Sequence, residues 1–348
     1  MRVAVVEEAA NRRRARGARF ASIVCTSNGL TVTGAAIATE PVATTRREVS
    51  QPLQFRRFVG VHCHRLGMGE VFIGSQAVRS GQLTGYQLRT DFRSIYQDVY
   101  VPKWGAVSLR DRTVGAWLWS KQRATIAGLS AAVLHGAQWV DDDVPVELIW
   151  RNTHPPDGVI VRNERLQDDE TTFVARLPVT TPARTAFDLG RHLPRGRALA
   201  RLDSLMRATP FSIADVLLIA KRHEGARGVR QLRSLLPLVD GGAASPKETW
   251  LRLLLIDAGF PKPTTQIPVH DRWELMALLD MGWEQFKVAA EYDGDQHRTD
   301  RSQYVKDIRR IPKLERRGWI VIRVIAEDHE DDIISRVYRA MTSRGWKP

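Results

Sequence analysis

The chain of 348 residues is poor in cysteine and in long apolar runs. Its two cysteines, Cys25 and Cys63, both lie within the first 67 residues, so the remainder can form neither a disulfide nor a thiolate metal site. No apolar stretch approaches the ~20 residues of a membrane-spanning helix. Residues 20–25 (FASIVC) are too few for the apolar part of an export signal. These absences lead us to expect a cytoplasmic protein.

Residues 1–67 also lack lysine and tryptophan. They hold eleven arginines and four acids without helical or strand periodicity. The run at 12–19 (RRRARGAR) is typical of a basic arm that binds nucleic acid, and 62–64 (HCH) of metal ligands, but no packed core is legible. We therefore interpret 1–67 as a disordered extension, or the product of an upstream start codon before Met68.

Positive charge is what the sequence has in excess. It carries 52 Lys and Arg against 39 Asp and Glu, a formal net charge of +13, which favours a polyanionic partner such as DNA. The hydrophobic content of 43% is ordinary for a globular protein, and the length allows two or three domains. We expect a multidomain protein with α/β and α+β parts.

Residues 68–102 show the pattern of a winged helix-turn-helix. Two short helices are predicted at 73–81 and 84–92, the second with Thr84 as N-cap, and a period-2 wing at 94–102. The second helix of such a unit faces a DNA groove or phosphates. The candidate DNA contacts are Tyr86, Gln87, Arg89 and Thr90. The same pattern also occurs in fragments that bind nothing, and this alternative stays open.

The rest of the chain predicts two further domains. Residues 103–240 form an α+β pattern with no catalytic spacing, and 241–247 (GGAASPK) a small-residue linker. Residues 248–348 predict a small mixed sheet flanked by helices. Its strands are expected at 264–269, 274–282, 286–294 and 319–325, and its helices at 247–259, about 300–317 and 331–341.

Carboxylates surround the strand predicted at 286–294. Alternation puts Lys287, Glu291 and Asp293 on one face, and antiparallel pairing can bring Asp280 near them, although parity does not fix the register. Converging carboxylates predict a site for Mg²⁺ or Mn²⁺, which would activate a water toward a phosphodiester. His297 would serve as general acid or base. The alternative is a solvated strand end and turn.

The series Asp280, Glu291, Asp293 and His297, continued to Arg323, resembles the very-short-patch-repair-like endonuclease branch of the PD-(D/E)xK superfamily over about 245–343. The resemblance implies a restriction-endonuclease-like fold with Asp280 and Glu291 as metal ligands. It also implies Glu248 as an accessory acid, His297 in proton transfer, and Asp307 and Arg310 in ordering a helix or gripping phosphate.

One position departs from that family. The lysine expected two residues after the second acid is Asp293, which can bind a metal but cannot donate to a phosphorane. Lys287 or Arg310 would have to supply the positive charge. Arg298 begins a stretch, ending at Arg323, with nine basic residues against three acids, which predicts a phosphate-facing end.

Residues 75–102, 126–136 and 177–189 resemble the AbiEi-type antitoxin family, over about 70–240. The resemblance implies a winged helix that binds operator DNA, with a toxin or methylase partner left open. Our main hypothesis is a Mg²⁺-dependent DNA endonuclease, or nuclease-like defence or repair protein, targeted by its winged helix. The alternative is a non-catalytic, antitoxin-like transcriptional regulator with a degenerate nuclease domain, which Asp293 favours. A third hypothesis is a partner-binding protein with neither activity.

Overall fold

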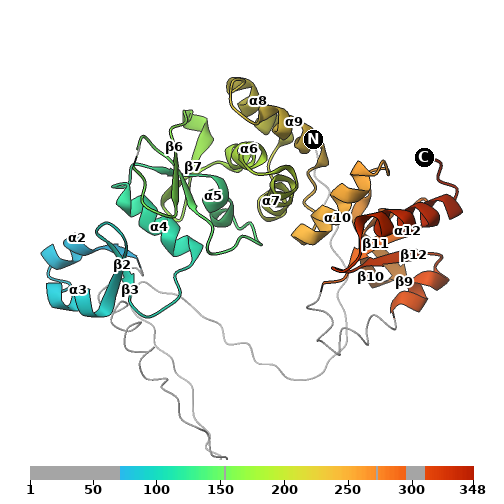
Figure 1. Ribbon diagram of the computed structural model, residues 1–348, viewed down its shortest axis with the longest axis horizontal. Coiled ribbons are helices and arrows are strands. Elements are labelled where there is room, and N and C mark those ends of the chain that lie inside the picture. The colour runs from blue at the N-terminus through green and yellow to red at the C-terminus, as the bar shows by residue number, and fades with distance from the viewer. Residues whose placement is uncertain (1–70, 153, 272, 295–309) are drawn as a thin grey trace, which may run out of the picture. The chain divides into compact units, whose positions relative to one another are not determined.

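The computed structural model describes residues 71–152, 154–271, 273–294 and 310–348 (Figure 1). The predictions for residues 1–67, His297, Arg298 and Asp307 therefore lie outside the described residues. In the described ranges, every helix is too short or too polar to cross a lipid bilayer.

The first described region is a three-stranded sheet with two short helices. It consists of β1 (Phe72–Ile73), α2 (Gly74–Arg79), α3 (Gly85–Asp91), β2 (Phe92–Tyr96) and β3 (Val99–Pro102), with strand order β1-β3-β2. The predicted N-cap is present: the Thr84 hydroxyl accepts from the Gln87 backbone N–H at 3.2 Å, and the Gln87 side chain accepts from the Thr84 backbone N–H. The helix pair and the hairpin agree with the sequence expectation, whereas β1 was not expected.

A second sheet follows, with strand order β6-β5-β4-β8-β7. The β4–β8 and β5–β6 pairs are parallel, and the β4–β5 and β7–β8 pairs are antiparallel. The strands are β4 (Thr125–Ile126), β5 (Val146–Ile149), β6 (Val159–Arg162), β7 (Thr171–Val174) and β8 (Leu177–Thr180). The helices of this region are α4 (Leu109–Trp119), α5 (Gly128–Leu134), α6 (Pro182–His192), α7 (Arg195–Ala208), α8 (Ile213–Arg222) and α9 (Val229–Leu235), with short 3₁₀ turns at Asp168–Glu170 and Leu236–Leu238.

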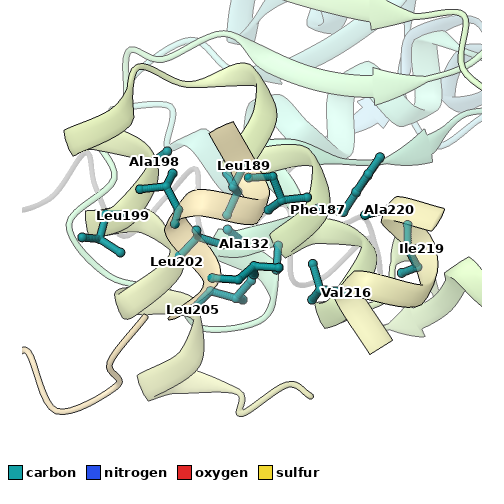
Figure 2. Packing of buried hydrophobic residues seen from close by; sticks show 14 of the residues in the cluster. Ala132, Phe187, Leu189, Ala198, Leu199, Leu202, Leu205, Val216, Ile219 and Ala220 are labelled. Carbon is teal, nitrogen blue, oxygen red and sulfur yellow. The ribbon is translucent and has the colours of Figure 1, made fainter. Parts of the chain in front are cut away.

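Helix α6 lies at the centre of the largest hydrophobic core. Thr181 caps the helix, and Pro182 starts it at a position where a missing N–H costs nothing. Phe187 and Leu189 of α6 pack with side chains from α7 and α8, such as Leu202 and Val216, in the cluster shown in Figure 2. This burial fixes the rotation of α6, and with it the direction of the polar side chains described below.

The C-terminal region contains a four-stranded sheet of order β12-β11-β10-β9. Its elements are α10 (Pro246–Asp257), β9 (Thr264–Asp271), β10 (Glu274–Trp283), β11 (Val288–Tyr292), β12 (Ile320–Val324) and α12 (Glu330–Ser343), and residues 310–316 are helical. The β9–β10 and β10–β11 pairs are antiparallel, and β11–β12 is parallel. Side chains of α10 and α12 pack against Met281 and Ala290, while Leu314 packs against Ala289.

Helices α7 and α10 pack against each other across the segment predicted as a linker. The Arg252 guanidinium of α10 donates to the Asp203 carboxylate of α7 at 2.5 Å, and the Thr249 hydroxyl donates to the same carboxylate at 2.8 Å. Asp203 and Arg252 are both fully buried. A second pair between the two helices, Arg195–Asp257, lies on the surface.

Candidate functional site

The structure brings three of the predicted acids together at the C-terminal sheet. Strand β10 pairs with β11 over Met281–Trp283, and Asp280 lies just before this paired stretch. The Asp280 carboxylate accepts a hydrogen bond from the Tyr292 backbone N–H at 3.0 Å. Glu291 of β11 and Glu248 of α10 are both buried. We call Glu248, Asp280 and Glu291 the acidic cluster.

The surroundings of Asp280 in the acidic cluster disfavour its ionised form. Burial raises the pKa of Asp280 to about 7, and the nearby charges of Glu248 and Glu291 act in the same direction. The Tyr292 N–H and the Arg310 guanidinium oppose this rise. A carboxyl group that takes up its proton near neutral pH is a common feature of functional sites.

Every carboxylate predicted to bind a metal already accepts hydrogen bonds from the protein. Both oxygens of Glu291 accept from the Arg310 guanidinium, each at 2.8 Å. Asp293 forms an ion pair with Arg323 at 2.5 Å, and Glu248 accepts from the Ala244 backbone N–H at 2.9 Å. These contacts satisfy the carboxylates without a cation.

The acidic cluster is less compact than another group of ionisable side chains in the described residues. Among the residues that the structure describes, one group of three offers ligand atoms all within 4.8 Å of one another, and that group is Glu164, Asp188 and His192. The three acids of the acidic cluster therefore do not all lie within that distance of one another. The metal-ligand roles of Asp280, Glu291 and Asp293 therefore stay predictions.

The position predicted for Lys287 is wrong. Lys287 lies in the turn before β11 with a φ of +50°, so the strand alternation that would put it beside Glu291 begins only at Val288. Its ammonium group donates to the Arg317 backbone carbonyl at 2.8 Å. Lys287 therefore cannot provide positive charge to the acidic cluster, and Arg310 provides it instead.

The four predicted DNA contacts of α3 differ in their availability. Tyr86 is 72% exposed, and Arg89 and Thr90 are also on the surface. Gln87 is half-buried, and its side-chain oxygen is engaged in the cap with Thr84. The role of Gln87 as a DNA contact stays a prediction.

Sequence reasoning missed further exposed groups in the same region. Arg79, Arg93 and Lys103 are on the surface, and the Lys103 ammonium lies 5.7 Å from the ring of Trp104, which is 70% exposed. These residues are scattered along the sequence and follow no helical period, so periodicity does not mark them as a group.

Sequence reasoning also missed a buried charge network on α6. The Arg184 guanidinium is fully buried and bonds to Glu164 at 2.8 Å, Glu170 at 2.5 Å and Asp188 at 3.1 Å. Arg191 donates to Asp188 at 3.0 Å and also contacts Glu164. The available signal was an Arg and an Asp four residues apart on a helix with a broad apolar face.

The ion pairs of this network explain why the close spacing of Glu164, Asp188 and His192 does not indicate a metal site. Burial alone would raise the pKa of Glu164, but hydrogen bonds and charge from His192 and Arg191 outweigh it and lower the pKa to about 2. Glu164 thus stays ionised, whereas burial raises the pKa of Asp188 against the opposing charges of Arg184 and Arg191. Each of the two acids already contacts both guanidinium groups. Two guanidinium groups in direct contact would repel a divalent cation.

Comparison with known proteins relates this part of the chain to antitoxins. Residues 125–238 match the family model of the AbiEi antitoxin C-terminal domain. Two uncharacterized proteins of Mycobacterium tuberculosis, from strains CDC 1551 / Oshkosh and ATCC 25618 / H37Rv, are each 34% identical over 149 residues. That match covers 43% of this chain and 55% of each relative, so the chain spans about half the length of these curated relatives. The predicted resemblance to AbiEi antitoxins is confirmed for residues 125–238.

Proposed function

We propose that the chain is a DNA-binding regulator of the antitoxin type. The observation that carries this proposal is the match of residues 125–238 to the AbiEi antitoxin C-terminal domain. A toxin partner is part of the proposal, because an antitoxin acts by opposing one. The net charge of +13 is compatible with operator DNA as the second partner.

In this proposal the first described region acts as a winged helix, with α3 toward the DNA. Tyr86 and Arg89 are exposed on α3, and the Thr84–Gln87 cap holds the start of that helix. Arg93 and Lys103, on the β2–β3 hairpin and just after it, would reach flanking phosphates. Exposed arginine and aromatic side chains that make no contact needed for the fold are suited to binding DNA.

The test is fluorescence anisotropy with a duplex from upstream of the chain's own gene, measured at several salt concentrations. We expect Arg89→Ala to weaken binding. The slope of log affinity against log salt concentration should also fall by about one, as expected for the loss of one phosphate contact. The matched control is Arg230→Ala on α9, also an exposed arginine. Equal losses in both variants would reject α3 as the DNA contact, and absence of salt-sensitive binding would reject the DNA-binding role.

The antitoxin role has a separate test. Co-expression of the chain with the product of the adjacent gene should relieve any growth arrest which that product causes alone. Persistence of the arrest at matched protein levels would count against an antitoxin function, whatever the DNA-binding result.

A second candidate function is metal-dependent DNA cleavage by the C-terminal region. The convergence of Glu248, Asp280 and Glu291 favours it, as does the predicted endonuclease resemblance. The Arg310–Glu291 and Arg323–Asp293 pairs argue against it, because they occupy the carboxylates without a metal. A degenerate nuclease domain within a regulator is consistent with all of these contacts, and we prefer it.

Plasmid nicking with Mg²⁺ or Mn²⁺ discriminates the two candidates. We expect no nicking by the purified wild-type chain. Nicking that is lost in both Asp280→Asn and Glu291→Gln, but kept in the surface control Asp331→Asn, would establish cleavage and overturn our preference. Nicking that survives in all three variants would point to a contaminating nuclease.

A further inference from the structure

A cavity of 810 Å³ lies beside α6 and the start of α9. It belongs to residues 125–238, which we call the AbiEi-like region. Basic side chains dominate its polar lining: Arg162, Arg165, Arg191, His192, His223 and Arg227. Glu164 is the acid in the lining, and it already contacts Arg184, Arg191 and His192. The cavity volume lies within the range of roughly 300–1,000 Å³ typical of small-molecule sites.

The floor of this cavity is held rigidly. The Arg191 side chain is 4% exposed, and its guanidinium lies over the Phe187 ring with 4.5 Å to the ring centre. Its Nε–H and the Nδ1 of His192 are buried without a hydrogen-bond partner among the described residues. The protein therefore fixes these two side chains without using up their polar capacity.

Two further arginines carry charge that nothing described compensates. Arg165 and Arg227 are exposed, and no ion pair or hydrogen bond of either side chain occurs among the described residues. Their backbones, in contrast, are anchored to the buried network. The Arg165 carbonyl accepts from Arg184 at 3.1 Å, and the Arg227 carbonyl accepts from Arg191 at 3.4 Å.

Gly228 allows this close anchoring. Its φ is +85°, and a Cβ at this position would lie 2.3 Å from the Arg191 backbone oxygen. Any other residue would push the segment carrying Arg227 away from α6. The fold thus holds the segment that carries Arg227 against the buried Arg191.

We propose that this cavity binds the phosphate groups of a nucleotide-sized small molecule. Arg165 and Arg227 would grip the phosphates through paired N–H donors, a geometry that suits guanidinium and phosphate. Leu193, Pro194 and Ala226 line the same cavity and provide apolar contact for the organic part. The site is separate in sequence from the proposed DNA contacts of α3, so the proposal goes beyond DNA binding and can fail independently of it.

The experiment is isothermal titration of the full chain at ~150 mM ionic strength with three probes: pyrophosphate, ATP and adenosine, with no divalent ion added. We expect saturable binding of pyrophosphate and ATP, and none of adenosine. Arg165→Gln and Arg227→Gln should each weaken binding at least about tenfold, since a hydrogen bond to a charged group contributes ~1.5–3 kcal/mol and 1.4 kcal/mol is tenfold. Unchanged thermal melting would show that both variants fold.

The control is Arg230→Gln, an exposed arginine of the same segment that does not line the cavity. Tighter binding of ATP than of pyrophosphate would show that the apolar wall contributes, and equal binding that the phosphates suffice; both support the site. Three results would overturn it: no saturable binding of either phosphate probe, the same loss in Arg230→Gln, or equally tight binding of a hexaglutamate peptide, which would indicate general attraction of acids.

Discussion

The protonation of Asp280 couples the acidic cluster to pH. Its pKa is about 7 in the folded chain against 3.8 ordinarily, because burial and the charges of Glu248 and Glu291 disfavour the carboxylate. Between these values the folded state holds a proton that the unfolded state has lost, so stability falls as pH rises from about 4 to about 7 and is then flat. Below about 4 both states are protonated, and the full contribution is present.

Asp280→Asn removes this titration while its side-chain oxygen can still accept from the Tyr292 N–H. We expect the variant to gain stability relative to wild type by about 2 kcal/mol more at pH 8 than at pH 5. Urea denaturation at both pH values measures this difference. A gain that is equal at the two pH values would show that Asp280 titrates normally; Asp331→Asn serves as the surface control.

Arg310 is the residue whose loss should harm the acidic cluster most. Its guanidinium forms two bonds to Glu291, and removing one partner of a buried pair leaves an uncompensated charge that costs about 3 kcal/mol. Arg310→Gln should therefore lower the free energy of unfolding by that amount, and adding Glu291→Gln should restore part of it. The exposed Arg317–Asp271 pair is the control, with a loss below about 1 kcal/mol for Arg317→Gln. Failure of the double variant to recover would mean that Arg310 stabilises the fold through other contacts.

At the scale of elements, the N-terminal cap of α3 depends only on neighbouring residues, so the sequence predicts it. Its contribution to stability can be tested alone. Thr84→Ala removes the acceptor for the Gln87 N–H and should destabilise the helix by about 1 kcal/mol. Hydrogen exchange of the α3 amides should quicken accordingly. Thr90→Ala, which loses only a bond back to the Tyr86 carbonyl, is the matched control. Equal exchange in the two variants would show that the cap does not hold α3.

The elements that could be predicted are those specified by neighbouring residues. Thr84 predicts a helix start, and short apolar or alternating stretches predict β2, β3, β9, β10 and β11. The short strands β1, β4, β7 and β8 were not predicted, because two to four residues are too few to show a period. The partners of β1 and β4 are also distant in sequence, whereas β7 and β8 pair with each other across a two-residue turn. Lys287 was misplaced because it has a left-handed backbone and the strand starts at Val288, two residues later than expected.

The candidate sites also have one part that the sequence could predict and another that it could not. Strand pairing made an approach of Asp280 to Glu291 possible without fixing the register, and Glu248 entered only through the endonuclease resemblance. Their neutralisation by Arg310, and the network around Arg184, depend on which side chains meet across separate elements. That information lies in the packing of the fold and has no period that a single sequence displays.

At the scale of the whole molecule, α7 and α10 couple the AbiEi-like region to the C-terminal sheet. Arg252→Leu would leave Asp203 buried without its partner and should cost about 3–5 kcal/mol, measured by calorimetry. Arg195→Gln breaks the surface pair between the same helices and should cost below about 1 kcal/mol. We also expect Arg252→Leu to divide the unfolding transition in two. A single transition at an unchanged midpoint would show that the buried pair does not join the regions.

The Arg310–Glu291 contact has a consequence for how the C-terminal sheet responds to its surroundings. A guanidinium tethered to the chain is an internal counterion, and its effective concentration at the carboxylate does not depend on the medium. We therefore expect the C-terminal sheet to need no ion from solution. The unfolding midpoint of the wild-type chain should accordingly be the same before and after exhaustive dialysis against a chelator, whereas a sheet held together by a bound divalent ion would lose stability on such treatment.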